Sequence, residues 1–476
     1  MNTRLSNSLG LHLVLLLLAG FWVTTNSVMS SEPTSAEEKS AVAPGVQKVD
    51  PFANATNPTP PPSVYNGPLF KLSHNYSGVP PAPPVNPPWI QALGGKPIGA
   101  GNAVAYVNAL KNYVAADMKQ LIFNYASWDA GKAGWFNQPW LAGEREAIHG
   151  TYIGSTFPPA TFPLQTNTMT TYVLTYYSQN AGFTVGMVWG NTAMTPNVKE
   201  AQFREGAIIV KLAFSSITGD QWPPMSGAAT WPIYASTNPN NLIGQDPSLF
   251  NVALMQLDII VKDTKTAPKT GWVFSTLVYD NSLPGDPWDR MVPLGAMWGN
   301  DPEVAANPNA PLKESVINPK APAYSIVTLG WGGRLSGPND GAVVAPGYVN
   351  GVIATVAASS CMSCHSPAEY PMKSFLLPVP TQNYNQESNP GAIPVIDNGL
   401  VLFEPGTLGW MKWFQSRSGS TPADPGTVAL DYDMVFAFKS LPNWAAATGK
   451  QDKLLLPLFK RTDAFRRGFK YNGLPK

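Results

Sequence analysis

The pattern of hydrophobic and polar positions first predicts one amphipathic helix. Apolar residues recur at spacings of three and four between Asn102 and Phe123, at Val104, Val107, Leu110, Val114, Met118 and Ile122. This spacing places them on a single face of an α-helix. We therefore expect a helix over residues 102–123 that buries this face against the rest of the protein.

Strand-like segments dominate the chain after this helix. Each consists mainly of β-branched and aromatic residues, and turn-forming residues lie near the ends of most of them. These segments are Thr171–Tyr177, Phe183–Trp189, Ala207–Phe214, Leu254–Lys262 and Trp272–Tyr279. The pattern predicts an antiparallel sheet.

A short sequence echo supports a single large β-rich domain. Gly186–Asn191 (GMVWGN) resembles Gly295–Asn300 (GAMWGN), and each copy follows a strand-like stretch. Two copies are compatible with duplicated halves of one sheet.

Composition narrows the fold class. The chain of 476 residues contains 48 Pro and 41 Gly, and only 13% of its residues are charged. So many helix breakers exclude a helical bundle and favour short strands joined by long loops. We expect an α+β fold, mainly antiparallel β-sheet with peripheral helices and long Pro/Gly-rich loops. The net charge of +1 and the lack of long single-sign runs argue against nucleic acid as a partner.

The N-terminus predicts export. Arg4 precedes the apolar run Leu9–Val23, and small or β-branched residues follow at Val28 and Ser30. A charged head, an apolar middle and a small-residue exit are typical of a secretory signal peptide, here residues 1–30. The apolar run is shorter than the roughly 20 residues of a membrane helix. We expect a periplasmic protein without a membrane segment after cleavage; an uncleaved membrane anchor is the alternative.

Residues 361–365 carry the candidate chemistry, with the sequence Cys361-Met362-Ser363-Cys364-His365. Two thiols three positions apart on one helical turn reach both vinyl groups of a haem, and the adjacent imidazole binds the iron. The motif predicts one covalently attached haem c, with Cys361 and Cys364 forming the thioethers and His365 as the proximal ligand.

Other uses of the two cysteines are weaker. A thioredoxin-like dithiol is expected in a βαβ setting, but this motif follows an Ala- and Ser-rich segment after a glycine-rich loop. A structural zinc site needs four ligands, and the chain has only two Cys and four His. A structural disulfide between Cys361 and Cys364 remains open for an exported protein, which would then be a non-redox binding module.

The motif segment also resembles a known class of protein. Ser359–Tyr370 (SSCMSCHSPAEY) resembles the haem-binding stretch of c-type cytochromes. A looser likeness lies in the order of Phe203–Lys211, Ile259–Asp263, Gly271–Phe274 and the motif. This order is similar to the β-sheet mono-haem cytochromes, namely cytochrome c-prime-beta and the lysine-cross-linked cytochromes that oxidise hydroxylamine. Those proteins are much smaller, so the likeness requires large insertions here. It implies a β-sheet over the distal haem face.

The sixth iron ligand separates an electron carrier from a catalyst. Met434 and Met411 are candidates because enough chain separates them from the motif to reach the other haem face, whereas Met372 follows His365 too closely. Each is also readily explained as core filler. His149 is the alternative imidazole ligand, and its competing interpretation is a structural residue hydrogen-bonded near Glu146 or Arg145. An open sixth position is the remaining possibility.

Three further cations are candidates for the haem pocket. Lys211 and Lys262 approach the haem if the β-sheet likeness holds, although most strand lysines face solvent. Arg334, in the loop before the motif, is suited to pair with a haem propionate, as arginine pairs well with carboxylates. The alternative is that Arg334 is an ordinary surface arginine of a loop.

Together these patterns predict an exported mono-haem c-type cytochrome that transfers electrons to or from a redox partner protein. The alternative is a haem enzyme or gas-binding protein with an open sixth position, acting on a small nitrogen or oxygen species. The expected organisation is a signal peptide at 1–30, a Pro-rich linker or extended arm at 31–88, a β-rich region at 89–345 and a haem-attachment region at 346–476. We expect the last two regions to pack as one domain.

Overall fold

The computed structural model describes residues 49–238, 243–340, 344–349, 352–357, 360–372, 392–395, 400–403 and 411–450. The predicted signal peptide at 1–30 lies outside the described residues, so export stays a prediction.

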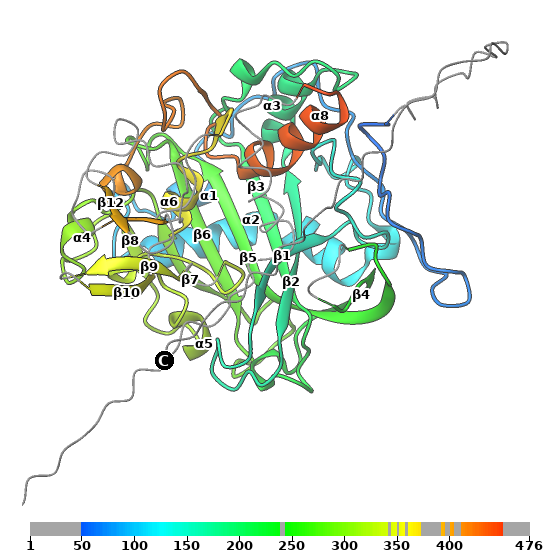
Figure 1. The fold of residues 1–476 in the computed structure, drawn as a ribbon, viewed down its shortest axis with the longest axis horizontal. Coiled ribbons are helices and arrows are strands. Elements are labelled where there is room, and N and C mark those ends of the chain that lie inside the picture. Colours follow the sequence, from blue (N-terminus) through cyan, green and yellow to red (C-terminus); the bar gives the residue numbers. More distant parts are fainter. Residues whose placement is uncertain are drawn as a thin grey trace, which may run out of the picture. The chain divides into compact units, whose positions relative to one another are not determined.

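An eight-stranded antiparallel sheet forms the centre of the fold (Figure 1). Its strand order is β1-β2-β3-β5-β6-β7-β8, and β4 pairs with one part of the long strand β5. The strands are β1 (Tyr152–Phe157), β2 (Met169–Tyr177), β3 (Ile208–Ser215), β4 (Thr230–Ala235), β5 (Ser248–Lys262), β6 (Trp272–Tyr279), β7 (Met291–Met297) and β8 (Ser315–Ile317). Neighbours in this order are mostly consecutive in sequence, and loops join them, with helix α3 between β2 and β3.

Helices and small hairpins surround the sheet. The helices are α1 (Pro88–Gln91), α2 (Ala103–Phe123), α3 (Gln179–Trp189), α4 (Glu303–Ala306), α5 (Ala323–Ile326), α6 (Cys361–His365) and α8 (Leu441–Ala447), the last preceded by a π-helical turn, η6 (Phe436–Ser440). The single-turn 3₁₀ segments are η1 (Tyr125–Ser127), η2 (Val198–Glu200), η3 (Pro223–Met225), η4 (Trp331–Gly333) and η5 (Lys412–Phe414). The hairpins pair β9 (Val344–Val349) with β10 (Val352–Ala357), β11 (Glu369–Tyr370) with β14 (Val428–Ala429), and β12 (Ala392–Val395) with β13 (Leu400–Phe403). The expected α+β class, mainly antiparallel sheet with peripheral helices, is confirmed.

Most of the predicted elements are found. The helix expected at 102–123 is α2, and the strands expected at 171–177, 207–214, 254–262 and 272–279 lie in β2, β3, β5 and β6. The strand predicted at Phe183–Trp189 is wrong, because this segment is the second half of helix α3.

Two glycines allow α3 to pack closely against its neighbours. A Cβ atom at Gly182 would lie 2.4 Å from the Phe136 ring, and one at Gly186 would lie 2.5 Å from Cβ of Tyr76. The helix therefore packs closely through these positions, and tertiary contact overrides the strand preference of its apolar residues. The echo between 186–191 and 295–300 has no structural counterpart, because the second copy begins in strand β7.

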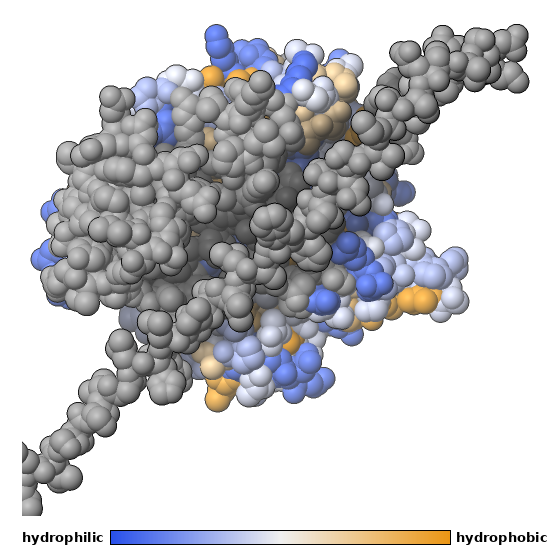
Figure 2. All heavy atoms as spheres, in the orientation of Figure 1, coloured by the Kyte–Doolittle hydropathy of each residue, from blue (hydrophilic) through white to orange (hydrophobic). Residues whose placement is uncertain are grey.

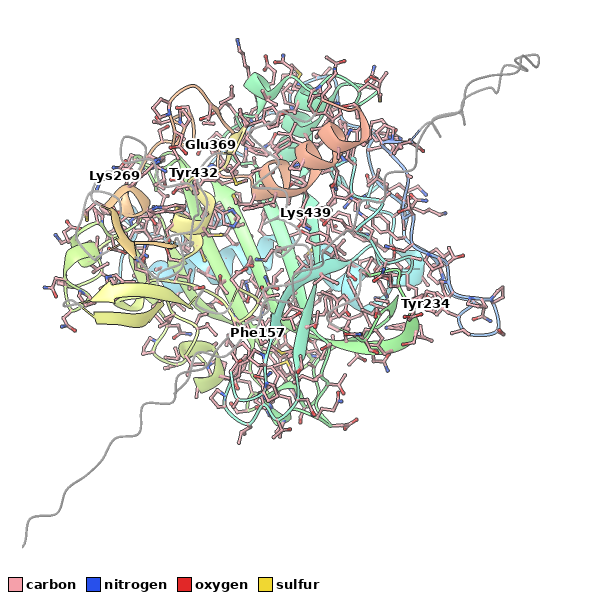
Figure 3. All side chains as sticks on the ribbon, viewed as in Figure 1. Phe157, Tyr234, Lys269, Glu369, Tyr432 and Lys439 are labelled. Atoms are coloured by element: carbon pink, nitrogen blue, oxygen red, sulfur yellow. The ribbon has the colours of Figure 1, made fainter. Side chains whose placement is uncertain are left out.

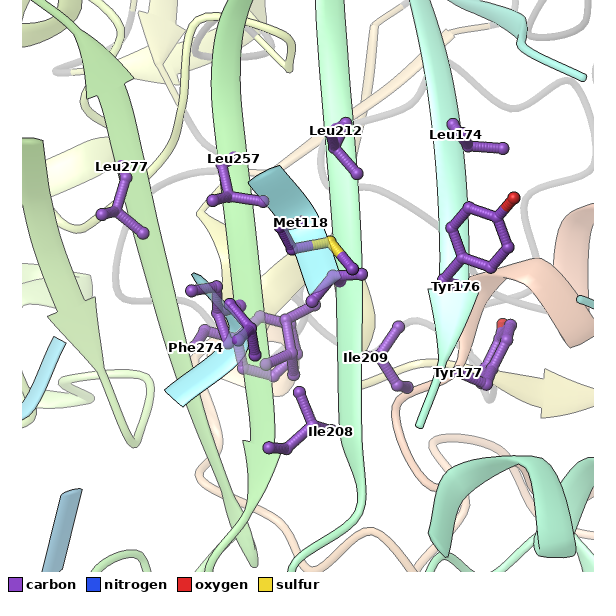
Figure 4. Close-up of a cluster of buried hydrophobic side chains, with 14 of the residues drawn as sticks. Met118, Leu174, Tyr176, Tyr177, Ile208, Ile209, Leu212, Leu257, Phe274 and Leu277 are labelled. Carbon is purple, nitrogen blue, oxygen red and sulfur yellow. The ribbon is translucent and has the colours of Figure 1, made fainter. Parts of the chain in front are cut away.

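Helix α2 covers one face of the sheet and forms the main core with it. Its side chains Val107, Leu110 and Met118 are fully buried. Figure 4 shows Met118 beside Leu212 of β3 and Leu257 of β5. Since side chains alternate along a strand, Lys211 and Asp258, each next to one of these leucines, face the opposite side.

Residues 49–87 form turns and irregular segments that contact the sheet domain. The Phe70 side chain is 2% exposed, and its backbone N–H donates to the carbonyl of Ala147 (3.0 Å). Gly150, at φ +73°, lies so close to Phe70 that a Cβ there would be 2.5 Å from the ring. The Tyr76 hydroxyl donates to the carbonyl of Asn137 (2.6 Å). This proline-rich segment therefore contributes buried side chains to the core.

The surface of the described residues is mainly polar on the face seen in Figure 2, where apolar atoms occur in small separate groups. In the part of the chain that the structure describes, none of the helices is both long and apolar enough to cross a membrane.

Candidate functional site

Helix α6 carries the cysteine motif and is held at its N-terminus by reciprocal serine bonds. The Ser363 N–H donates to Oγ of Ser360 (3.3 Å), and the Ser360 N–H donates to Oγ of Ser363 (2.9 Å). The Cys361 N–H donates to the carbonyl of Leu335 (2.9 Å). A helix of five residues is unstable alone, so this capping box and the tether to Leu335 fix the turn.

The two thiols and the imidazole line one pocket between α6 and the sheet. Cys361, Cys364 and His365 border it from the helix, and residues of β3, β5 and β6 form the facing wall. The cysteines are not joined in a disulfide. Burial raises the pKa of Cys364 to about 12 and that of Cys361 well above its ordinary value. Both are therefore neutral thiols at neutral pH.

His365 is oriented by a backbone carbonyl. Its Nδ1 lies 2.8 Å from the carbonyl oxygen of Tyr432, and Figure 3 labels Tyr432 close to α6. A carbonyl only accepts, so this contact assigns the ring proton to Nδ1 and leaves the lone pair on Nε2. The ring also meets Phe274 edge-on, with centroids 4.8 Å apart.

The protonation state of His365 suits a metal ligand. Burial lowers the pKa of His365 to about 4, so the imidazole is neutral at neutral pH. A neutral imidazole whose second nitrogen donates to a carbonyl is the usual arrangement of a metal-bound histidine in proteins.

The facing wall of the pocket holds a polar cluster, in which Lys211 and Asp258 are mostly buried and the Asp340 side chain is 41% exposed. Lys211 Nζ lies 3.1 Å from Oδ2 of Asp258 and 3.3 Å from Oδ2 of Asp340. Asp258 also accepts from the Thr276 hydroxyl (2.8 Å) and from the Gln256 amide (2.8 Å). One ammonium group is thus shared by two carboxylates.

The charges in this cluster depend on one another. Burial alone would lower the pKa of Lys211, but Asp340 and Asp258 together raise it above its ordinary value. Burial raises the pKa of Asp258, and Lys211 partly offsets this shift. The pocket therefore presents a charged donor and carboxylate acceptors next to the thiols.

Of the predicted cations, only Lys211 lines this pocket. Lys262 instead binds Asp431 (2.7 Å), the residue before Tyr432. Arg334 is fully buried, where its Nη1 donates to the Asn300 carbonyl (3.3 Å) and its guanidinium stacks on Phe414 (3.8 Å). Arg334 directly precedes Leu335, whose carbonyl accepts from the Cys361 N–H, so its backbone lies close to the motif in space.

The structure does not bring the candidate sixth ligands into the pocket. Met434 is partly buried against the core. It lies two residues after Tyr432, whose carbonyl contacts Nδ1 of His365 and not Nε2, the nitrogen that would bind a metal. Met411 directly precedes the short helical turn η5, and Met372 is buried in the core. None of the three borders the pocket.

His149 is packed among aromatic rings away from this pocket. It stacks on Trp231 (centroids 4.1 Å, planes 6° apart) and lies 4.1 Å from the Tyr125 ring, beside the end of α2. Its backbone N–H donates to Oε1 of Glu146 (2.7 Å). Burial lowers the pKa of His149 to about 3, which keeps the ring neutral.

Three groups of this site, Asp258, Asp340 and the Tyr432 carbonyl, were not predicted from the sequence. Asp258 stands in the apolar run LMQLDIIVK, and an acid within such a run is a signal of a buried polar role. The carbonyl of Tyr432 gives no signal, because every residue has one.

The donor set fits a c-type haem. Two unlinked thiols three positions apart border the same pocket as a neutral imidazole, and the Nε2 lone pair of that imidazole is not used by the Tyr432 contact. Within the described residues, no three His, Cys, Asp or Glu side chains cluster as a metal site of their own.

Comparison with family models, with curated proteins and with solved structures gives no match for this chain. The resemblance to the β-sheet mono-haem cytochromes therefore stays a prediction.

Proposed function

We propose that this chain is an exported mono-haem c-type cytochrome. One haem c would be held by thioethers from Cys361 and Cys364, with His365 as the proximal iron ligand. The bound haem supplies one-electron redox chemistry, which the protein would exchange with a partner protein in the periplasm.

The observation that carries the proposal is the hydrogen bond between His365 and the carbonyl of Tyr432. It fixes the imidazole in the tautomer that leaves Nε2 available, and it raises the basicity of that nitrogen. The unlinked cysteines support the same proposal.

The test is expression of the full chain with haem-maturation machinery, followed by acidified acetone extraction and intact-mass measurement. We expect the haem to stay on the protein and the mass to increase by one haem. Replacing both cysteines, Cys361→Ser with Cys364→Ser, should release it. Met362→Leu, a volume-conserving change between the cysteines, should retain it.

A mass equal to the polypeptide alone overturns the proposal. A mass lower by two hydrogens would instead identify the Cys361–Cys364 disulfide and the binding-module alternative.

A second candidate function is favoured by the lining of the pocket. His365 is the only His or Met among the described residues that border it, while Lys211, Asp258 and Asp340 form its polar wall. These groups are suited to hold a small polar molecule through charged hydrogen bonds. The second proposal is a haem protein with an exchangeable sixth position that acts on, or binds, a small nitrogen or oxygen species.

The ferrous spectrum with and without carbon monoxide separates these two functions. A low-spin spectrum with a sulfur ligand, unaffected by carbon monoxide, identifies the electron carrier. A high-spin ferrous iron that binds carbon monoxide rapidly identifies the exchangeable position.

A further inference from the structure

Two consecutive residues next to the site have an unusual backbone conformation. Asp431 has φ 46° and Tyr432 has φ 69°, and neither is glycine. Side-chain-bearing residues rarely adopt this left-handed region, and two in succession persist only where the surroundings hold them. This turn therefore has to be stabilised by specific contacts.

The Asp431 carboxylate makes those contacts. It is fully buried and accepts from three groups: Lys262 Nζ (2.7 and 2.8 Å), Trp272 Nε1 (2.8 Å) and the Phe203 N–H (2.8 Å). Gly419 allows this placement, because a Cβ there would lie 1.7 Å from Oδ1 of Asp431. We call Asp431, Lys262 and Trp272 the carboxylate anchor.

The anchored turn presents one carbonyl to the proximal histidine. The carbonyl of Tyr432 accepts from Nδ1 of His365 (2.8 Å), while the Tyr432 hydroxyl donates to the carbonyl of Arg417 (2.7 Å). The Leu430 N–H donates to the carbonyl of Ala368 (2.9 Å), three residues after His365. The Asp431 carboxylate and the His365 ring are thus linked through the backbone of one residue, Tyr432.

We propose that Asp431 is a positioning residue for the proximal haem ligand. It acts through the Tyr432 carbonyl to fix the plane of the His365 ring and the strength of its Nδ1 hydrogen bond. This inference rests on the proposed haem function. Under this inference, the buried ion pair between Asp431 and Lys262, at the end of strand β5, tunes the reduction potential of the iron.

The expected direction follows from the hydrogen bond. A strong bond from Nδ1–H to a carbonyl makes the imidazole a better electron donor, which favours ferric over ferrous iron. If the turn relaxes, this bond weakens, the ferrous state gains relative stability, and the reduction potential rises.

The experiment compares the holoprotein with Asp431→Ala and Asp431→Asn. The readouts are the reduction potential, from a redox titration, and the NMR shift of the His365 Nδ1 proton. We expect both to change in Asp431→Ala, with a higher potential. Asp431→Asn keeps one of the two oxygens, so it still accepts from either Trp272 or Phe203, but it loses the other bond and the charge opposite Lys262. An intermediate shift is therefore expected. Asp431→Asn also provides the test if Asp431→Ala does not fold.

Asp263→Asn is the matched control. Asp263 is also a buried aspartate, next to Lys262 in the chain, but it accepts from the Tyr106 hydroxyl (2.7 Å) on the α2 side. This variant should leave both readouts unchanged.

Folded Asp431 variants that keep haem and show the wild-type potential and Nδ1 signal overturn the inference. An equal shift in Asp263→Asn also overturns it, because the effect would then be a general loss of rigidity. A wild-type protein that carries no covalent haem overturns the proposed function itself, and the two failures are therefore distinguishable.

Discussion

Lys211 Nζ lies 3.1 Å from Oδ2 of Asp258 on the neighbouring strand, in the pocket that also holds Cys361. Both side chains are mostly buried, with side-chain exposures of 17% and 8%. Removing one partner of a buried pair leaves the other charge without compensation, which costs about 3–5 kcal/mol. The free energy of unfolding of Lys211→Met should therefore fall by about this amount in denaturant titrations.

Lys269→Met provides the comparison, because Lys269 pairs with Glu314 but is 66% exposed. Its loss should cost less than about 1 kcal/mol. Equal small losses in both variants would mean that the Lys211 pair is solvated in solution.

The stability of the protein should depend on pH through Glu369. Burial, with the adjacent Asp424 carboxyl, raises the pKa of Glu369 from 4.5 to about 7. The folded state therefore binds this proton more tightly than the unfolded chain does. Its contribution is fully present below about pH 4.5 and is lost as the pH rises through 7, roughly 3 kcal/mol in total. The free energy of unfolding in urea, determined from pH 4.5 to 8, measures this contribution.

Glu369→Gln should remove that part of the pH dependence. Glu303→Gln, at an exposed glutamate paired with Lys313, should retain the wild-type profile. A Glu369→Gln profile parallel to the wild type would contradict the raised pKa.

If the proposed haem is bound, the ligand state of its iron should not change when the distant candidates are replaced. Met434→Leu, Met411→Leu and His149→Phe should each leave the ferrous and ferric spectra of the holoprotein as in the wild type, because none of these residues borders the pocket of His365. Phenylalanine at 149 also keeps the stacking on Trp231. A change of spin state in any one variant would identify that residue as the sixth ligand.

The proline-rich segment before α1 should contribute directly to stability. Phe70 is 2% exposed and packs against Gly150 and the Arg145 guanidinium. Phe70→Ala should lower the free energy of unfolding by about 3–5 kcal/mol. Leu69→Ala, at the neighbouring 38% exposed position, should change it by about 0.5 kcal/mol or less. Similar values for the two variants would show that this segment is detached from the domain in solution.

The sequence predicted four of the eight strands of the sheet, β2, β3, β5 and β6, because these strands are mostly buried on both faces. In β2 and β6 every residue is buried, so continuous β-branched and aromatic runs mark them clearly. The same residue types misled the prediction at 183–189. There the buried positions Ala181, Val185 and Val188 follow the helical spacing, but Gly182 and Gly186 disfavour a helix until Phe136 and Tyr76 pack against them.

The candidate site was predictable only as far as its side chains form a local motif. Cys361, Cys364 and His365 lie within five residues, and their chemistry follows from their spacing. Asp258, Asp340 and Tyr432 reach the site through strand register and chain reversal. Their part in it depends on long-range contacts that no local pattern encodes.

Tyr432 follows His365 by 67 positions. During synthesis the cysteine motif therefore emerges well before the carbonyl that orients its imidazole. Until the C-terminal part of the chain folds back against the sheet, the His365 ring lacks its hydrogen bond to Tyr432. The final orientation of this histidine is consequently a late event in folding, and a chain shortened before residue 432 would contain the complete motif without the carbonyl that orients His365.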